Sequence, residues 1–188
     1  MRGGCGKGKA GPFVPMTKRN KSDVANLNAT VSSVVKNFKP PEDLDVDAWA
    51  EKYRRLPAGM TAEAGPWRTE RTPYLREPMK AFTDPKIHKI VMVSASQIGK
   101  SELELNIIGY IIAQDPGSIL YVHPTIEDAR KFSRLRVAPM IRESRVLQDR
   151  VSDIKSRDSG NTILQKSFPG GMLTITGPNS PSALASPP

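Results

Sequence analysis

The sequence predicts an α/β fold built around a parallel sheet, and two features of the chain carry this prediction. Apolar runs of strand length at 87–93 and 118–123 are each followed by a segment whose apolar residues have helical spacing. Two strand–helix units in succession favour parallel strands joined by right-handed crossovers. Ligands of such sheets bind at the carboxyl ends of the strands, so we expect the loops 94–101 and 123–125 to emerge there together.

The composition fits one sizeable core with an appendage, and it limits the classes of partner. Hydrophobic residues make up 38% of the 188-residue chain, proline occurs 17 times, and the net charge is +9. That charge favours a polyanionic partner, nucleic acid or an anionic membrane, with ordinary solubility as the alternative. The single cysteine, Cys5, excludes a disulfide framework and a cysteine-based zinc site. No run reaches membrane-spanning length and the N-terminus lacks a signal peptide, so we expect a cytosolic setting without membrane attachment.

Three regions are expected along the chain. Residues 1–41 read as a basic tail, mostly disordered or weakly helical, because the first 22 residues carry six basic side chains and no acidic one. Residues 42–86 read as an extension that leads into the core. It would hold a short helix capped by Asp45 or Asp47, a crossing segment rich in Pro and Gly, and a second short helix at 75–82. Residues 87–188 form the core.

The core strands follow from their apolar patterns. The run at 87–93 is almost continuously apolar, as a strand buried on both faces should be. The second strand, 118–123, follows the breaker Asp115-Pro116-Gly117. Alternating residues at 161–167 and 171–176 predict a hairpin that turns around Pro169-Gly170-Gly171.

Two helices complete the core. The first is expected from Lys100 to Gln114, between a loop of small residues and the Asp-Pro-Gly breaker. The second is expected from Ile126 to about Ile141, after Pro124-Thr125.

The stretch KIVMVSASQIGKS at 89–101 has the residue types of a phosphate-binding loop. Strand, loop, Gly-Lys-Ser and helix, in that order, are the context of the P-loop. Gly99 would let the backbone approach a phosphate, while loop amides and the helix N-terminus would present partial positive charge. Lys100 would reach the β- and γ-phosphates of a nucleotide, and the Ser101 hydroxyl would ligate Mg²⁺.

A structural alternative exists for this motif. The full pattern G-x-x-x-x-G-K-[ST] has glycine where this chain has Ser94, which lacks the freedom of glycine at positive φ. In the alternative, the tripeptide is a helix start with Ser101 near the N-cap and Lys100 solvated. Gln97 would sense phosphate or water, or it is a tolerated loop residue.

Other polar residues also have both a structural and a functional interpretation. His88 and His123 have no partners at ligand spacing, so we expect no metal site at either. Thr125 would contact phosphate or the DNA backbone, or cap the next helix. The basic residues along 130–136 would form a solvated face, or one arginine among them would act on the γ-phosphate, although nothing in the sequence selects which.

Five stretches, in order, carry a resemblance to a known family. They are RTPYLREPM at 71–79, SASQIGKSE at 94–102, NIIGYIIAQDPGSILYVHPT at 106–125, ARKFSRLRVAPMI at 129–141 and KSFPGGMLTITGPNSPSALAS at 166–186. From about Trp67 to Ser186 the chain resembles the large terminase subunit of tailed bacteriophages, the lambda-type (GpA) family of DNA-packaging ATPases. The resemblance implies that 87–188 is a truncated P-loop ATPase core, with an incomplete P-loop NTPase (RecA-like) parallel sheet.

The resemblance also implies a function and partners. The family's motor hydrolyses ATP with Mg²⁺ to push double-stranded DNA into an empty procapsid, and a metal-dependent nuclease in the same subunit cuts concatemers. We therefore expect the partners to be double-stranded DNA, the small terminase subunit and the portal of the procapsid. The working motor would be an oligomer in the host cytoplasm.

The family's nucleotide site maps onto this chain by position. The Walker A loop and the residue after it fall on Ser94, Ala95, Ser96, Gln97, Ile98, Gly99, Lys100, Ser101 and Glu102. Tyr74 matches the adenine-side element and would stack on the base, although Leu75 stands where a glutamine often occurs.

The chain also departs from the family pattern. Ser96 or Gln97 stands where a basic residue is often found, and Pro187 stands where the family usually places an arginine. The Walker B acid and the nuclease domain have no counterpart in the sequence. We therefore expect an amino-terminal fragment that binds ATP weakly and does not turn it over. The rival interpretations are a helicase-like nucleic-acid-dependent P-loop ATPase and a non-enzymatic DNA-binding protein.

Overall fold

The computed structural model describes residues 42–59, 63–151 and 161–178 of the chain. The chain divides into two units, 1–41 and 42–188, and only the second is described here. The expected basic tail, with its weakly helical stretch at 23–38, lies outside the described residues.

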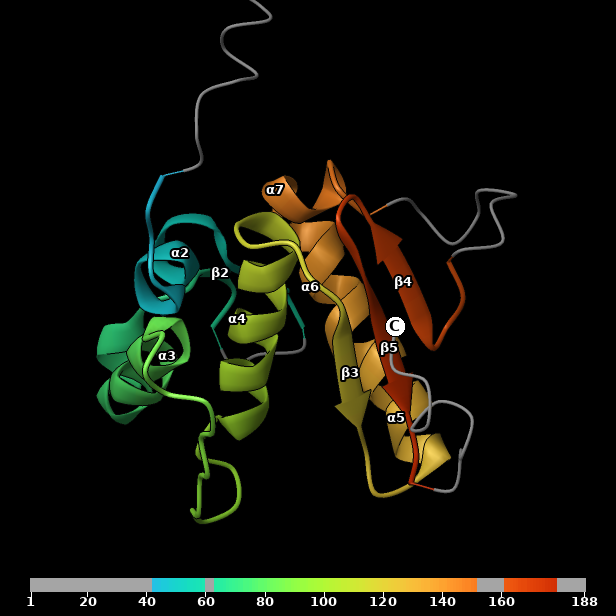
Figure 1. Ribbon diagram of the computed structural model, residues 1–188, viewed down its shortest axis with the longest axis horizontal. Coiled ribbons are helices and arrows are strands. Elements are labelled where there is room, and N and C mark those ends of the chain that lie inside the picture. Colours follow the sequence, from blue (N-terminus) through green and yellow to red (C-terminus); the bar gives the residue numbers. More distant parts are fainter. Residues whose placement is uncertain (1–41, 60–62, 152–160, 179–188) are drawn as a thin grey trace, which may run out of the picture. The chain divides into compact units, whose positions relative to one another are not determined.

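The described residues form a mixed α/β arrangement of helices and short strands, which agrees with the predicted α/β class (Figure 1). In chain order the elements are α2 (Val46–Tyr53), β1 (Arg55–Leu56), β2 (Gly65–Pro66), the 3-10 helices η1 (Thr69–Arg71) and η2 (Pro73–Leu75), α3 (Arg76–Thr83), α4 (Lys100–Ala113), β3 (Ile119–Val122), α5 (Ile126–Phe132), the π-helical turn η3 (Ser133–Val137), α6 (Ala138–Glu143), α7 (Arg145–Gln148), β4 (Gln165–Phe168) and β5 (Gly171–Thr176).

The main sheet is mixed, with the order β3-β5-β4. β3 and β5 pair in parallel, Ile119 opposite Leu173, so the sheet contains a parallel pair, although not between 87–93 and 118–123, the two segments on which the sequence prediction rests. β4 and β5 pair antiparallel with Phe168 opposite Gly171, so the predicted hairpin turns at Pro169 and Gly170. α5 packs on β5, and Figure 1 shows α5 and α6 behind the parallel pair.

The predicted strand at 87–93 is wrong. These residues belong to no strand or helix and pair with no described strand. Val91 and Val93 are 71% and 95% exposed, whereas Met92 packs against the core. An apolar run indicates that a segment is suited to burial, but it does not identify the strand with which the segment would pair. No described strand edge pairs with this segment.

The helices agree with the sequence, and their boundaries have local causes. The predicted helix at 100–114 is α4, and the one at 126–141 is the continuous α5–η3–α6 run. Asp45 caps α2, since its Oδ1 accepts a hydrogen bond from the Ala48 amide at 2.7 Å. Pro139 lies at the start of α6, and because it has no N–H, the helix opens into the π-turn η3 immediately before it.

A polar network around the buried Asp47 joins α2, η1 and α3. Asp47 of α2 accepts hydrogen bonds from the Thr69 hydroxyl at 2.6 Å and from Nε of Arg76 at 3.1 Å. The indole of Trp67 donates to the same threonine hydroxyl at 2.9 Å. Asp47 therefore fixes η1 and the start of α3 against α2, instead of capping the helix.

α2 packs closely against α4 because α4 carries a glycine at the contact. Trp49 is fully buried and stands on edge against Tyr110, with ring centroids 6.5 Å apart. A Cβ added at Gly109 would lie 2.4 Å from Cη2 of Trp49. Gly109 therefore sets the distance between the two helices.

Gly109→Ala should destabilise the protein by about 1–3 kcal/mol through overpacking, although alanine favours helices intrinsically. Urea unfolding followed by circular dichroism measures the change. Gly117→Ala is the matched control, because the nearest atom to its added Cβ is a backbone oxygen at 4.0 Å. Equal stability of the Gly109→Ala variant and the wild type would contradict this packing account.

β3 and α4 are joined by a hydrogen bond from the Tyr121 hydroxyl to Glu104. The ring of Tyr121 stacks on Phe132 with centroids 4.6 Å apart. Burial raises the pKa of Tyr121, and the hydrogen bond to Glu104 raises it further.

The raised pKa of Tyr121 predicts a stability change at alkaline pH. The folded state retains a proton that the unfolded state releases above about pH 10, so stability falls as pH rises through that region. Tyr121→Phe should lose less stability than the wild type between about pH 9 and 11. Urea midpoints at each pH measure this difference, and parallel curves for the two proteins would contradict it.

Candidate functional site

The loop 94–99 turns the chain into α4 through two residues with left-handed backbone. Gln97 has φ 62° and Gly99 has φ 90°. Among the described residues Gln97 is the one non-glycine with positive φ, so Ser94 does not take that conformation. The absent glycine at position 94 therefore imposes no backbone strain on the turn.

The first turn of α4 leaves main-chain donors free at the loop. Gly99 is the N-cap, and its carbonyl accepts from the amides of Glu102 at 2.9 Å and Leu103 at 3.1 Å. The amides of Lys100 and Ser101 have no acceptor among the described residues. Free amides and the dipole of a 14-residue helix suit an anion.

The side chain of Lys100 folds back over the loop. Its ammonium group donates to the carbonyl of Ala95 at 2.6 Å and to that of Ser94 at 3.4 Å. Ser101, the next residue, is exposed on the first turn of α4. An ammonium, an exposed hydroxyl and free amides are thus gathered within one turn, which is the donor set that a phosphate with a bound divalent cation needs.

Tyr74 lies beside this loop. Its hydroxyl donates to the carbonyl of Ile98 at 2.9 Å, and its side chain is 52% exposed. The structure thus brings the expected base-side tyrosine to the loop, while its stacking on a base stays a prediction.

Behind the loop, the first turn of α4 is held by a buried arginine. Arg54 donates from Nη2 to Glu102 at 2.7 Å and from Nε to Asn106 at 3.1 Å. Its Nη1 donates to the carbonyl of Arg55 at 3.0 Å. Burial lowers the pKa of Arg54, the Glu102 carboxylate opposes that change, and the charge of Arg136 adds to it.

A second arginine contacts the other oxygen of Glu102. Nη1 of Arg136 lies 3.3 Å from Oε1, and its side chain is 44% exposed whereas that of Glu102 is 19% exposed. Among the basic residues 130–136, Arg136 is the one whose side chain contacts Glu102 in the described part of the chain, while an action of any of them on the γ-phosphate stays a prediction. Glu102 directs its carboxylate at these two guanidinium groups, and its place at the nucleotide stays a prediction.

Thr125 acts as the N-cap of α5. Its hydroxyl accepts from the Asp128 amide at 3.1 Å and donates to Oδ2 of the same residue at 2.9 Å. The capping alternative is therefore the one observed, and contact with phosphate or DNA stays a prediction. Figure 1 shows the carboxyl end of β3, just before this residue, at the same end as the N-terminus of α4.

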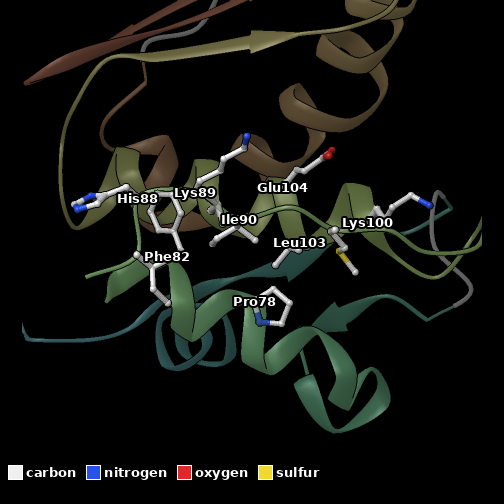
Figure 2. Close-up of a pocket in the computed structure, with 11 residues that line it drawn as sticks. Pro78, Phe82, His88, Lys89, Ile90, Lys100, Leu103 and Glu104 are labelled. Atoms are coloured by element: carbon white, nitrogen blue, oxygen red, sulfur yellow. The ribbon is translucent and has the colours of Figure 1, made fainter. Parts of the chain in front are cut away.

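A cavity of about 460 Å³ lies between α3, the segment 87–92 and α4 (Figure 2). Phe82, Ile90 and Leu103 supply part of the apolar side of its wall. Lys100 also lines the cavity, and Figure 2 shows its ammonium group turned away from Phe82 and His88. The phosphate-suited donors therefore belong to the loop and not to the apolar part of this cavity.

Neither a cluster of metal ligands nor a membrane-spanning helix occurs among the described residues. In the described parts of the chain, no three His, Cys, Asp or Glu side chains come together as metal ligands. Within those same residues, no helix has both the length and the apolar character needed to cross a membrane.

Arg54 and Asn106 were not found from the sequence. Asn106 is fully buried in the apolar stretch of α4. The one sequence feature that could have indicated its role is that it is a polar residue among apolar neighbours. Arg54 had none, since its partners lie 48 and 52 residues away.

The family is shown by comparison with known proteins. Residues 61–188 match the family described as phage terminase large subunit gpA, ATPase domain, and because this match covers most of the chain, the chain belongs to that family. It is 26% identical over 152 residues to the terminase large subunit of Escherichia phage lambda, covering 81% of this chain and 23% of that protein. It is 22% identical over 148 residues to the terminase large subunit of Enterobacteria phage P21, covering 79% of this chain and 23% of that protein.

The chain thus spans about a quarter of the length of these curated relatives. No solved structure matches it.

Replacing Arg54 should break the buried network. Arg54→Met leaves Asn106 without its donor and Glu102 with one arginine, so we expect a loss of about 3–5 kcal/mol of stability. Arg55→Met is the control, because that neighbouring side chain is exposed. Chemical unfolding of both variants measures the effect, and equal stability of the two would contradict a structural role for Arg54.

Proposed function

We propose that this chain binds Mg²⁺–ATP at residues 94–101 and supplies the nucleotide-binding loop of a phage DNA-packaging ATPase. The observation that carries this proposal is the Lys100 ammonium held over the loop beside the free amides of Lys100 and Ser101. Membership of the terminase large-subunit ATPase family supports ATP as the ligand. We further propose that the fold is a P-loop NTPase fold of the RecA-like type.

Each residue of the loop has a proposed role in nucleotide binding. The amides that follow Gly99 would hold phosphate oxygens, and Lys100 would exchange the Ala95 carbonyl for phosphate. The Ser101 hydroxyl would hold Mg²⁺, and the exposed ring of Tyr74 would lie against the base. Bound Mg²⁺ would neutralise charge that develops on the phosphates during transfer to water.

Hydrolysis also requires a side chain that orients the attacking water, and a carboxylate is one group that can do so. Glu102 is poorly suited to this task, because both of its oxygens are engaged by arginines. We propose that the acid is another residue, and that nucleotide binding by this chain is separable from turnover. Binding, and not turnover, is therefore the appropriate measurement for this chain.

The remaining roles follow from the family and are proposed for the whole protein. ATP hydrolysis would drive double-stranded DNA into the procapsid through the portal, in an oligomer that works with the small terminase subunit in the host cytoplasm. A metal-dependent endonuclease would cut the DNA. The family match argues against both a helicase-like ATPase and a non-enzymatic DNA-binding protein.

Lys100→Ala should abolish detectable Mg²⁺–ATP binding, because among the described residues the Lys100 ammonium is the side-chain cation that contacts the loop carbonyls. Isothermal titration calorimetry on the full chain measures this. Lys89→Ala removes a lysine that lines the neighbouring cavity, and this control should bind ATP as the wild type does. Undiminished binding by Lys100→Ala, or equal losses in both variants, would refute the assignment of the loop.

A further inference from the structure

Glu102 places a negative charge in the first turn of α4, immediately after the two residues proposed to meet phosphate and Mg²⁺. A carboxylate at this position stabilises the helix but repels a polyphosphate that approaches the same helix end. The two arginines on Glu102 reverse that repulsion, since two guanidinium groups and one carboxylate leave one net positive charge.

The two arginines are not equivalent. Arg54 is fully buried, with its guanidinium bonded to Glu102, Asn106 and the Arg55 carbonyl, so it acts as a fixed structural group. Arg136 reaches Glu102 with one nitrogen at 3.3 Å and is 44% exposed. It can therefore be replaced without opening the buried network.

The conformation of the main chain around Arg136 supports a functional role for this residue. Arg136 belongs to the π-turn η3 that precedes Pro139, and π-turns inside helices frequently occur at functional sites. Arg134, in the same turn, is also exposed but contacts no carboxylate among the described residues. The turn thus presents two arginines, of which one pairs with the helix that carries the phosphate loop.

We propose that Arg136 is a positioning residue for polyphosphate binding, which acts through Glu102. Its pairing with Oε1 of Glu102 neutralises the carboxylate next to the loop and keeps the first turn of α4 net positive. This inference rests on the proposed function, because it assumes that residues 94–101 bind the phosphates.

The test compares two arginines of the same turn. Arg136→Gln should weaken Mg²⁺–ATP binding to the full chain by about tenfold at low salt, and by less at high salt, because the lost term is electrostatic. Arg134→Gln removes the same charge without removing the Glu102 contact, and it should change the affinity by less than about twofold. Arg136→Lys keeps the charge and should restore most of the affinity.

A double-mutant cycle shows whether Arg136 acts through Glu102. In a Glu102→Gln background the further change Arg136→Gln should cost no more affinity than Arg134→Gln does, because no carboxylate remains to be left unpaired and only the loss of one exposed charge is left. The same tenfold loss in both backgrounds would mean that Arg136 contacts the nucleotide directly and would overturn the proposal.

Other outcomes also decide the question. Equal affinities of Arg136→Gln and Arg134→Gln would overturn the proposal, as would failure of Arg136→Lys to bind better than Arg136→Gln. This comparison stands even where Glu102→Gln fails to fold, since both arginines are exposed. If the wild type itself binds no ATP, the proposed function fails. If the wild type binds ATP and Arg136→Gln binds it equally well, this inference alone fails.

Discussion

The position of the loop 94–99 depends on one ion pair, between the buried Arg54 and the largely buried Glu102 at 2.7 Å. The guanidinium comes from the residue that ends α2, and the carboxylate lies in the first turn of α4. A charge taken out of water needs full hydrogen bonding to be tolerated, and Arg54 obtains it from Glu102, Asn106 and a backbone carbonyl. These partners fix the rotation of α4 about its axis, and with it the direction in which the loop amides point.

The packing around this pair has the same effect. Gly109 lets Trp49 approach α4 one turn beyond Asn106, and Met79 of α3 lies within 3.5 Å of the Asn106 amide nitrogen. α2, α3 and α4 therefore form one unit that carries the loop at its end. The contact of Tyr121 with Glu104 joins this unit to β3, so the loop and the sheet are connected through α4.

The sequence predicted the elements whose causes are local. The start of α4 at Gly99-Lys100, the cap at Asp45 and the hairpin at Pro169-Gly170 each depend on residues within a few positions. The prediction of a strand at 87–93 was wrong for a different reason. The composition of this segment shows that it is suited to burial, but strand pairing depends on two segments. Arg54 was missed for the same kind of reason, because a contact between residues far apart in the sequence produces no periodic pattern of residue types.

Ser94 needs no glycine-like conformation, a property of the backbone that the sequence did not reveal. The left-handed positions of the loop are Gln97 and Gly99, so the glycine that matters most is the one directly before Lys100. Glu102 is the opposite case: its position was expected from the resemblance, but its engagement with two arginines was visible only in three dimensions.

The most direct test of the central claim is a map of amide chemical shifts as Mg²⁺–ATP is added to the ¹⁵N-labelled chain. The account predicts that the amides of Gly99, Lys100 and Ser101 shift first and most. Shifts confined to the cavity wall around Phe82 and Ile90, with the loop amides unchanged, would contradict it.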